Sequence, residues 1–106
     1  MSHAPVSVVV IHRNRADAIE RTVASFASQT VPTQIVVVDN GSDADTMQAL
    51  PHLIGPAKLV ATGANLGFGP GGNVGIRLWL RTHDTEWLVI APHDALPDED
   101  TLERML

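Results

Sequence analysis

The stretch that decides the fold is Ile35-Val-Val-Val-Asp-Asn-Gly-Ser42, in which an uninterrupted aliphatic run stops at an acid and a turn. Such a run is typical of a strand that is buried on both faces, as in a parallel sheet covered by helices. A strand of this kind delivers the residues that follow it to the carboxyl edge of the sheet, where open α/β folds bind ligands. Asp39 is therefore either a site residue at this edge or, with Asn40, a residue that starts a turn and caps the next helix.

The segments on both sides of this strand alternate between strand and helix patterns. Further strands are predicted at Val6–Ile11, Lys58–Thr62 and Trp87–Ala91. Helices are predicted from Asp17 to Ser28, from a cap at Asp43 to Pro51, from Asn73 to about Arg81, and after a cap at Asp98. Pro51 should end or kink its helix. Because one βαβ unit takes roughly 30 residues, the pattern predicts an α/β fold with a mainly parallel sheet of about four strands flanked by helices.

Length and composition limit the classes of function. The chain has 106 residues, enough for one domain, with 44% hydrophobic and 18% charged residues, as in ordinary globular proteins. A net charge of -5 argues against a nucleic-acid partner. The chain has no cysteine for a disulfide or a thiolate metal site. Together with the lack of a signal peptide or membrane-spanning pattern, this composition leads us to expect a cytoplasmic protein.

Two loops could carry chemistry. In His12-Arg-Asn-Arg15, the guanidinium groups could pair with phosphate or stack on a base, or the loop could simply be polar. In the second loop, Gly67, Gly69 and Gly72 match G-x-G-x-x-G, which suggests a dinucleotide site at a helix start. The glycines do not follow directly on the predicted strand, and an equally good interpretation is a loop that lets a helix approach the sheet closely.

A third candidate is Pro92-His93-Asp94, which follows the last predicted strand. A carboxylate beside an imidazole can hold a divalent cation that neutralises a diphosphate. A single carboxylate is a small ligand set for a divalent cation, and single aspartates in turns mostly have a structural role.

In order and spacing, these segments resemble the amino-terminal part of family 2 glycosyltransferases, which have the GT-A fold with its Rossmann-like half. Val6–Arg15 resembles the family's first strand, which ends Thr-Tyr-Asn-Arg, and Val36–Ser42 resembles its second strand with the nucleotide-binding acid. Asn65–Ile76 resembles the Asn-Leu-Gly-Phe segment of rhamnosyltransferase-like members, and Trp87–Pro97 stands where the family has Asp-X-Asp. The resemblance covers essentially the whole chain.

The resemblance implies roles for the matching residues in binding a nucleoside-diphosphate sugar. Asp39 would hydrogen-bond the base or ribose, and the backbone of His12, Arg13 and Asn14 would line the base pocket. Asn65 and Gly67 would lie against the nucleotide. Asp94 would meet a divalent cation, Mn or Mg, that bridges the diphosphate.

Two departures from the family pattern affect this interpretation. Arg13 stands in place of an aromatic residue, and Pro92 stands in place of the first acid of Asp-X-Asp. Either His93 compensates as a ligand, or the cation is held mainly by Asp94 and the substrate phosphates. Metal dependence is therefore open.

The resemblance also implies that the catalytic base lies beyond Leu106, since no residue here matches it. The chain stops on apolar residues partway through a helix, so residues 1–106 are expected to be the donor-binding segment of a longer GT-A domain, inactive alone. In the whole enzyme, which could sit at the inner face of a membrane, transfer to an acceptor hydroxyl would be inverting. An exposed sheet edge would favour a homodimer. The alternatives are a dinucleotide (NAD or FAD) domain using Gly67, Gly69 and Gly72, and a non-catalytic nucleotide-binding module.

Overall fold

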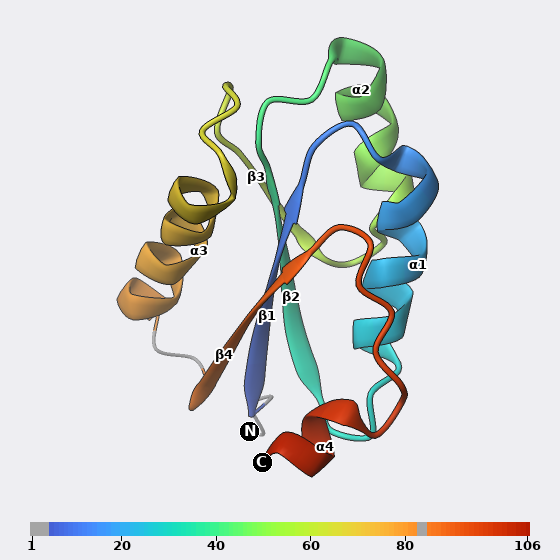
Figure 1. Cartoon of the computed structure of the whole chain (residues 1–106), viewed down its shortest axis with the longest axis vertical. Coiled ribbons are helices and arrows are strands. Elements are labelled where there is room, and N and C mark those ends of the chain that lie inside the picture. Colours follow the sequence, from blue (N-terminus) through green and yellow to red (C-terminus); the bar gives the residue numbers. More distant parts are fainter. Residues whose placement is uncertain (1–4, 83–84) are drawn as a thin grey trace.

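The structure, a computed structural model, describes residues 5–82 and 85–106 as strands and helices that alternate along the chain (Figure 1). The strands are β1 (Val6–His12), β2 (Thr33–Asp39), β3 (Lys58–Ala61) and β4 (Trp87–Pro92). The helices are α1 (Ala16–Ala27), α2 (Ala44–Leu53), α3 (Phe68–Thr82) and α4 (Thr101–Met105). The strands form one parallel sheet in the order β3-β2-β1-β4, so the predicted fold class is confirmed.

The sheet lies between α3 on one face and α1 and α2 on the other (Figure 1). Because successive side chains of a strand point to opposite faces, the aliphatic runs of β1 and β2 supply both layers of the core. Val8, Val10 and Val37 pack in the cluster that includes residues of α1 and α2. Val9 and Val38 pack in the second cluster, on the side of α3. Burying one such side chain is worth about 1.5–3 kcal/mol, so these runs account for much of the stability of the sheet.

Helix α3 approaches the sheet closely because of its small residues. A Cβ atom at Gly75 would lie 2.8 Å from Cγ2 of Val9 and would overlap its Cγ1. Gly71 similarly faces Ile11 and Asn40, at 3.3 and 3.1 Å from their nearest atoms. The glycines therefore set the distance between α3 and β1, as one of the two interpretations of this segment predicts.

The predicted boundaries need three corrections. Helix α3 begins at Phe68 rather than Asn73, so three of the glycines expected in the loop, Gly69, Gly71 and Gly72, lie in its first turns. Pro70 fits there because the first N–H groups of a helix have no partner within it. Pro51 lies inside α2, which continues to Leu53 because the neighbouring Leu50 and Ile54 are buried. The N-cap position of the last helix is Asp100, not Asp98, and the Asp100 side chain makes no capping hydrogen bond. No helix among the described residues has the length and apolar character needed to cross a membrane.

Candidate functional site

The carboxyl ends of β1, β2 and β4 meet at one edge of the sheet, as parallel strands require. In the register of the sheet His12 pairs with Asp39, and Ile11 pairs with Pro92. The sequence-predicted residues at these three strand ends are therefore brought together. His12 and Asp39 are buried, with exposed fractions of 0% and 1%.

His12 and Asp39 form the centre of a buried hydrogen-bonded cluster with Ser42. Asp39 Oδ1 lies 2.8 Å from His12 Nδ1 and accepts from Ser42 Oγ at 2.6 Å, while Oδ2 accepts from the Ser42 N–H at 2.9 Å. His12 Nε2 accepts from the N–H of Arg15 at 3.0 Å. Because a neutral imidazole carries one ring hydrogen, that hydrogen is on Nδ1 and is donated to Asp39.

The loop after β1 is fixed by side chains from all three strand ends. Its three consecutive N–H groups, those of Arg13, Asn14 and Arg15, donate to His93 Nδ1 at 3.2 Å, Ser42 Oγ at 2.9 Å and His12 Nε2 at 3.0 Å. Asn14 has a left-handed backbone, with φ of 50°, and its Oδ1 accepts from the N–H of Asp43. This loop is therefore held in one shape, and its amides are already used.

Asn40 holds the glycine-containing loop against the same edge. The side chain is buried, donates to the carbonyl of Gly67 at 2.9 Å and accepts from the N–H of Leu66 at 3.1 Å. Gly41 allows close approach here, since its φ is +86° and a Cβ would lie 2.6 Å from the backbone of Ala64. Asn65 accepts from the N–H of Gly67 at 3.2 Å, so both predicted residues lie at the edge.

His93 and Asp94 follow β4 but have different environments. The carbonyl of His93 accepts from Thr22 Oγ1 of α1 at 2.8 Å, and its ring packs edge-on against His12 with centroids 5.6 Å apart. Partial burial, and after it the positive charge of Arg15, lowers the pKa of His93 from its usual value, which favours the neutral ring. Asp94 is exposed.

The residues described here do not assemble a cation site on their own. Among residues 5–82 and 85–106, no three His, Cys, Asp or Glu side chains gather in a way that could hold a metal ion. Asp94 supplies one carboxylate, and Pro92 supplies no ligand where a second acid would stand. Within the part of the chain that the structure describes, Nδ1 of His93 accepts the Arg13 N–H and Nε2 makes no hydrogen bond.

A pocket of about 230 Å³ opens at this polar edge, lined by the ends of β1 and β4, Asn40, the glycine-containing loop and the start of α3. Among the sequence-predicted residues it is lined by His12, Arg13, Asn65, Gly67 and His93. Phe68 also lines it and is 53% exposed, which is unusual for an aromatic side chain. Asn14, Asp39 and Asp94 do not line this pocket.

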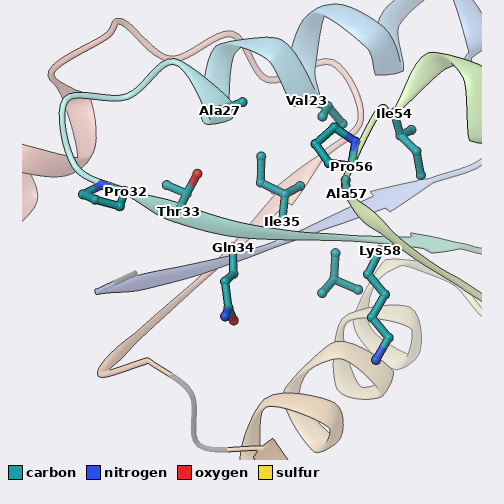
Figure 2. A pocket seen from close by; sticks show the side chains of 11 residues that line it. Val23, Ala27, Pro32, Thr33, Gln34, Ile35, Ile54, Pro56, Ala57 and Lys58 are labelled. Carbon is teal, nitrogen blue, oxygen red and sulfur yellow. The ribbon is translucent and has the colours of Figure 1, made fainter. Parts of the chain in front are cut away.

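A larger hollow of about 630 Å³ lies around the opposite end of β2, between it and residues of α1 and the α2–β3 connection (Figure 2). Its lining includes Val23, Ile35 and Ile54, while Gln34 and Lys58 point to the other side of the sheet. Ligand sites combine apolar walls with a few convergent polar groups. Polar groups converge on the smaller pocket, whereas Gln34 and Lys58 beside the larger hollow point away from it, so the smaller one is the candidate site.

Three residues of the site were not predicted from the sequence: Ser42, Asn40 and Phe68. Asn40 and Ser42 lie in the stretch that decides the fold, but only the three-dimensional contacts distinguish their roles from those of ordinary turn residues. Phe68 could have been predicted from the sequence as an exposed site residue, since it is an aromatic residue between two glycines.

The G-x-G-x-x-G match has a different geometry from the one expected for a dinucleotide fingerprint. Gly67 comes six residues after the end of β3, and Gly69 and Gly72 lie within α3. The fingerprint requires a tight turn directly between strand and helix. Gly71 and Gly75 of α3 serve to pack the helix against the sheet.

Comparisons with known proteins agree with this architecture. The mannosyltransferase PcManGT from Pyrobaculum calidifontis, in complex with GDP-Man and Mn2+, is 31% identical with a TM-score of 0.73, over 96% of this chain and 31% of that one. TarS 1-349 from S. aureus, in complex with UDP, is 25% identical with a TM-score of 0.74, over 94% of this chain and 30% of that one. This chain thus spans less than a third of either structure. No curated protein sequence matches it. The sequence profile of glycosyl transferase family 2 matches residues 7–106, and the chain belongs to this family.

Proposed function

We propose that residues 1–106 form the donor-binding segment of a glycosyltransferase and bind the nucleoside diphosphate of a sugar donor at the polar edge of the sheet. The observation that carries this proposal is the pocket of about 230 Å³, where the ends of two strands, Asn40, a glycine-containing loop and an exposed Phe68 converge. This volume is below the roughly 300 Å³ at which typical small-molecule pockets begin, so it suits part of a ligand, such as a base with its ribose. The GDP-Man and UDP bound by two similar structures support a ligand of this class.

The site residues would act as follows. The backbone of His12 and Arg13 would line the base pocket, with Asn14 fixing the shape of the same loop, and Asn65 and Gly67 would contact the nucleotide. Asp39 accepts three hydrogen bonds within the protein. Since it is 1% exposed and does not line the pocket, Asp39 would serve the base or ribose by fixing His12 and Ser42 around the site.

In the transfer reaction, an acceptor hydroxyl would attack the anomeric carbon while the bond to the diphosphate breaks, with inversion. The electron pair of that bond leaves with the diphosphate, whose developing charge needs a positive partner. Arg13, which lines the pocket, would supply one. We assign no residue of this chain as the base that deprotonates the acceptor.

A divalent cation, Mn or Mg, would be held mainly by the donor phosphates. Since the described residues gather no set of three ligands, Asp94 is the carboxylate that this chain can contribute. The Mn2+ in the PcManGT complex supports a cation bound together with a donor.

Thermal unfolding with UDP, dTDP, GDP and NAD, each with and without Mn2+, tests the proposed function. At least one nucleoside diphosphate is expected to raise the unfolding temperature, because ligands that bind only the folded state stabilise it. Stabilisation by NAD alone would instead favour the dinucleotide-binding alternative. If a diphosphate binds but the whole protein transfers no sugar, the non-catalytic module is the better description.

Replacing Phe68 by alanine is expected to weaken binding of the stabilising diphosphate about tenfold. Stacking of a base on an aromatic side chain is worth about 1–3 kcal/mol, and Phe68 is half exposed, so its loss should affect folding little. Trp87→Ala is the matched control, since Trp87 is 54% exposed but lies at the other end of the sheet. Calorimetric titration measures both variants, and equal losses would show that Phe68 is not a contact of the ligand.

A further inference from the structure

The hydrogen-bonding state of His93 is fixed by its neighbour. Nδ1 accepts the backbone N–H of Arg13 at 3.2 Å, so this nitrogen carries a lone pair and no hydrogen. A neutral imidazole has a single ring hydrogen, which must then be on Nε2. No residue in the described part of the chain accepts a hydrogen bond from Nε2. His93 therefore presents a free N–H donor at the polar edge.

The ring of His93 is also held in place. The backbone carbonyl of His93 accepts a hydrogen bond from Thr22 Oγ1 at 2.8 Å. The His93 ring packs against the ring of His12, with an angle of 69° between the two planes, and His93 lines the pocket. Coordination of a metal by Nε2 would require moving the hydrogen to Nδ1, which would break the bond from Arg13. That change would leave the N–H of Arg13 without its acceptor, so the observed arrangement favours a donor over a metal ligand.

Several other groups at this edge that could meet a phosphate already have partners. The three backbone N–H groups of the loop after β1 are bonded to side chains and cannot form an anion-binding nest. The guanidinium of Arg15 is paired with Asp17 at 3.0 Å. The guanidinium of Arg13 makes no hydrogen bond or ion pair within residues 5–82 and 85–106. The pKa of Asp43 is lowered mainly by hydrogen bonds from Thr46, and the charge of Arg13 adds a smaller contribution.

We propose that His93 and Arg13 bind the donor diphosphate directly, His93 as a neutral donor through Nε2–H, so that diphosphate binding does not depend wholly on a divalent cation. This inference rests on the proposed function and replaces the metal-ligand role that the sequence suggested for His93. Two observations lead to it. The Arg13 N–H donates to Nδ1 of His93, which leaves the ring hydrogen on Nε2, and Asp94 is the one carboxylate at the position where the family has Asp-X-Asp.

Calorimetric titration of the chain with UDP and GDP, in EDTA and in Mn2+, tests this proposal. Binding in EDTA is expected to remain within about tenfold of binding in Mn2+. His93→Gln should keep binding in EDTA within about threefold, because its amide offers an N–H donor in a similar place. His93→Asp should weaken binding in EDTA by at least tenfold, since a hydrogen bond to a charged group is lost and a carboxylate faces phosphate.

A metal-ligand role predicts the reverse order. Aspartate is a good ligand for Mn2+ and glutamine is a poor one, so His93→Asp would then keep binding in Mn2+ while His93→Gln would lose it. His52→Gln is the matched control, since His52 is exposed on α2 and away from the edge. The thermal unfolding of each variant, measured without ligand, identifies any variant that fails to fold. If the His93 variants do not fold, Arg13→Gln tests direct diphosphate binding independently, and it is expected to weaken binding in EDTA about tenfold.

The outcomes separate this inference from the proposed function. Binding that requires Mn2+ and follows the metal-ligand order overturns the direct role of His93 and Arg13, while donor binding stands. Absence of binding by folded chain under both conditions, with UDP and with GDP, overturns the proposed function and this inference with it.

Discussion

Replacing Asp39 by alanine is expected to lower the free energy of unfolding by about 3 kcal/mol and to abolish nucleoside diphosphate binding. Asp39 is 1% exposed and accepts from His12, Ser42 Oγ and the Ser42 N–H. A buried donor left without an acceptor costs about 1–3 kcal/mol, and the alanine leaves two such groups, on His12 and on the Ser42 backbone. His12 and Ser42 in turn hold the loop after β1, so the pocket should lose its shape.

Chemical denaturation and calorimetric titration measure the two effects of Asp39→Ala. Asp43→Ala is the control, because Asp43 is an exposed N-cap that accepts from Thr46, and losing such a cap costs about 1 kcal/mol. If Asp39→Ala were no more destabilising than Asp43→Ala, the buried cluster would not have the importance given to it. Wild-type affinity for UDP or GDP in a folded Asp39→Ala chain would contradict its role in the site.

The second large effect is expected at Gly75, where alanine should destabilise the chain by about 2 kcal/mol. The added Cβ would overlap Val9, a stiff and buried side chain, so α3 must move away from β1. Overpacking of this kind costs about 1–3 kcal/mol, partly offset by the better helix propensity of alanine. Because α3 begins at Phe68, its displacement should also weaken nucleotide binding.

Gly69→Ala serves as the control for Gly75→Ala, since a Cβ at Gly69 would have no neighbour within 4 Å. This change is expected to leave stability unchanged or raise it slightly, because glycine is the poorer helix former. Denaturant titration of both variants gives the comparison. Equal stability of the two would mean that α3 does not pack as closely on β1 as described.

The order of strands and helices could be predicted because it depends on local patterns. The aliphatic run before Asp39 and the alternating core of the sheet are properties of neighbouring residues, and the predicted parallel sheet follows from them. The start of α3 could not be predicted in this way. Glycine disfavours a helix locally, yet the packing of Gly71 and Gly75 against the sheet outweighs this preference.

For the candidate site, the sequence predicted which residues lie at the edge of the sheet better than it predicted which partners their side chains contact. His12, Asp39 and His93 were identified because they follow strands, and the register brings the three strand ends together. Asn40, Ser42 and Phe68 were missed, because their contacts join segments that are distant along the chain. The ring nitrogen that carries the hydrogen in His93 likewise depends on a backbone N–H eighty residues away in the sequence.

The loop after β1 also determines how association should proceed. Its three amides are bonded to three different side chains, and Asn14 already has a left-handed backbone, before any ligand arrives. Ordering a flexible segment on binding reduces affinity, and a conformational change slows association. The loop after β1 needs neither ordering nor a change of conformation, so it should add no entropic penalty to binding of the donor and no slow step to association.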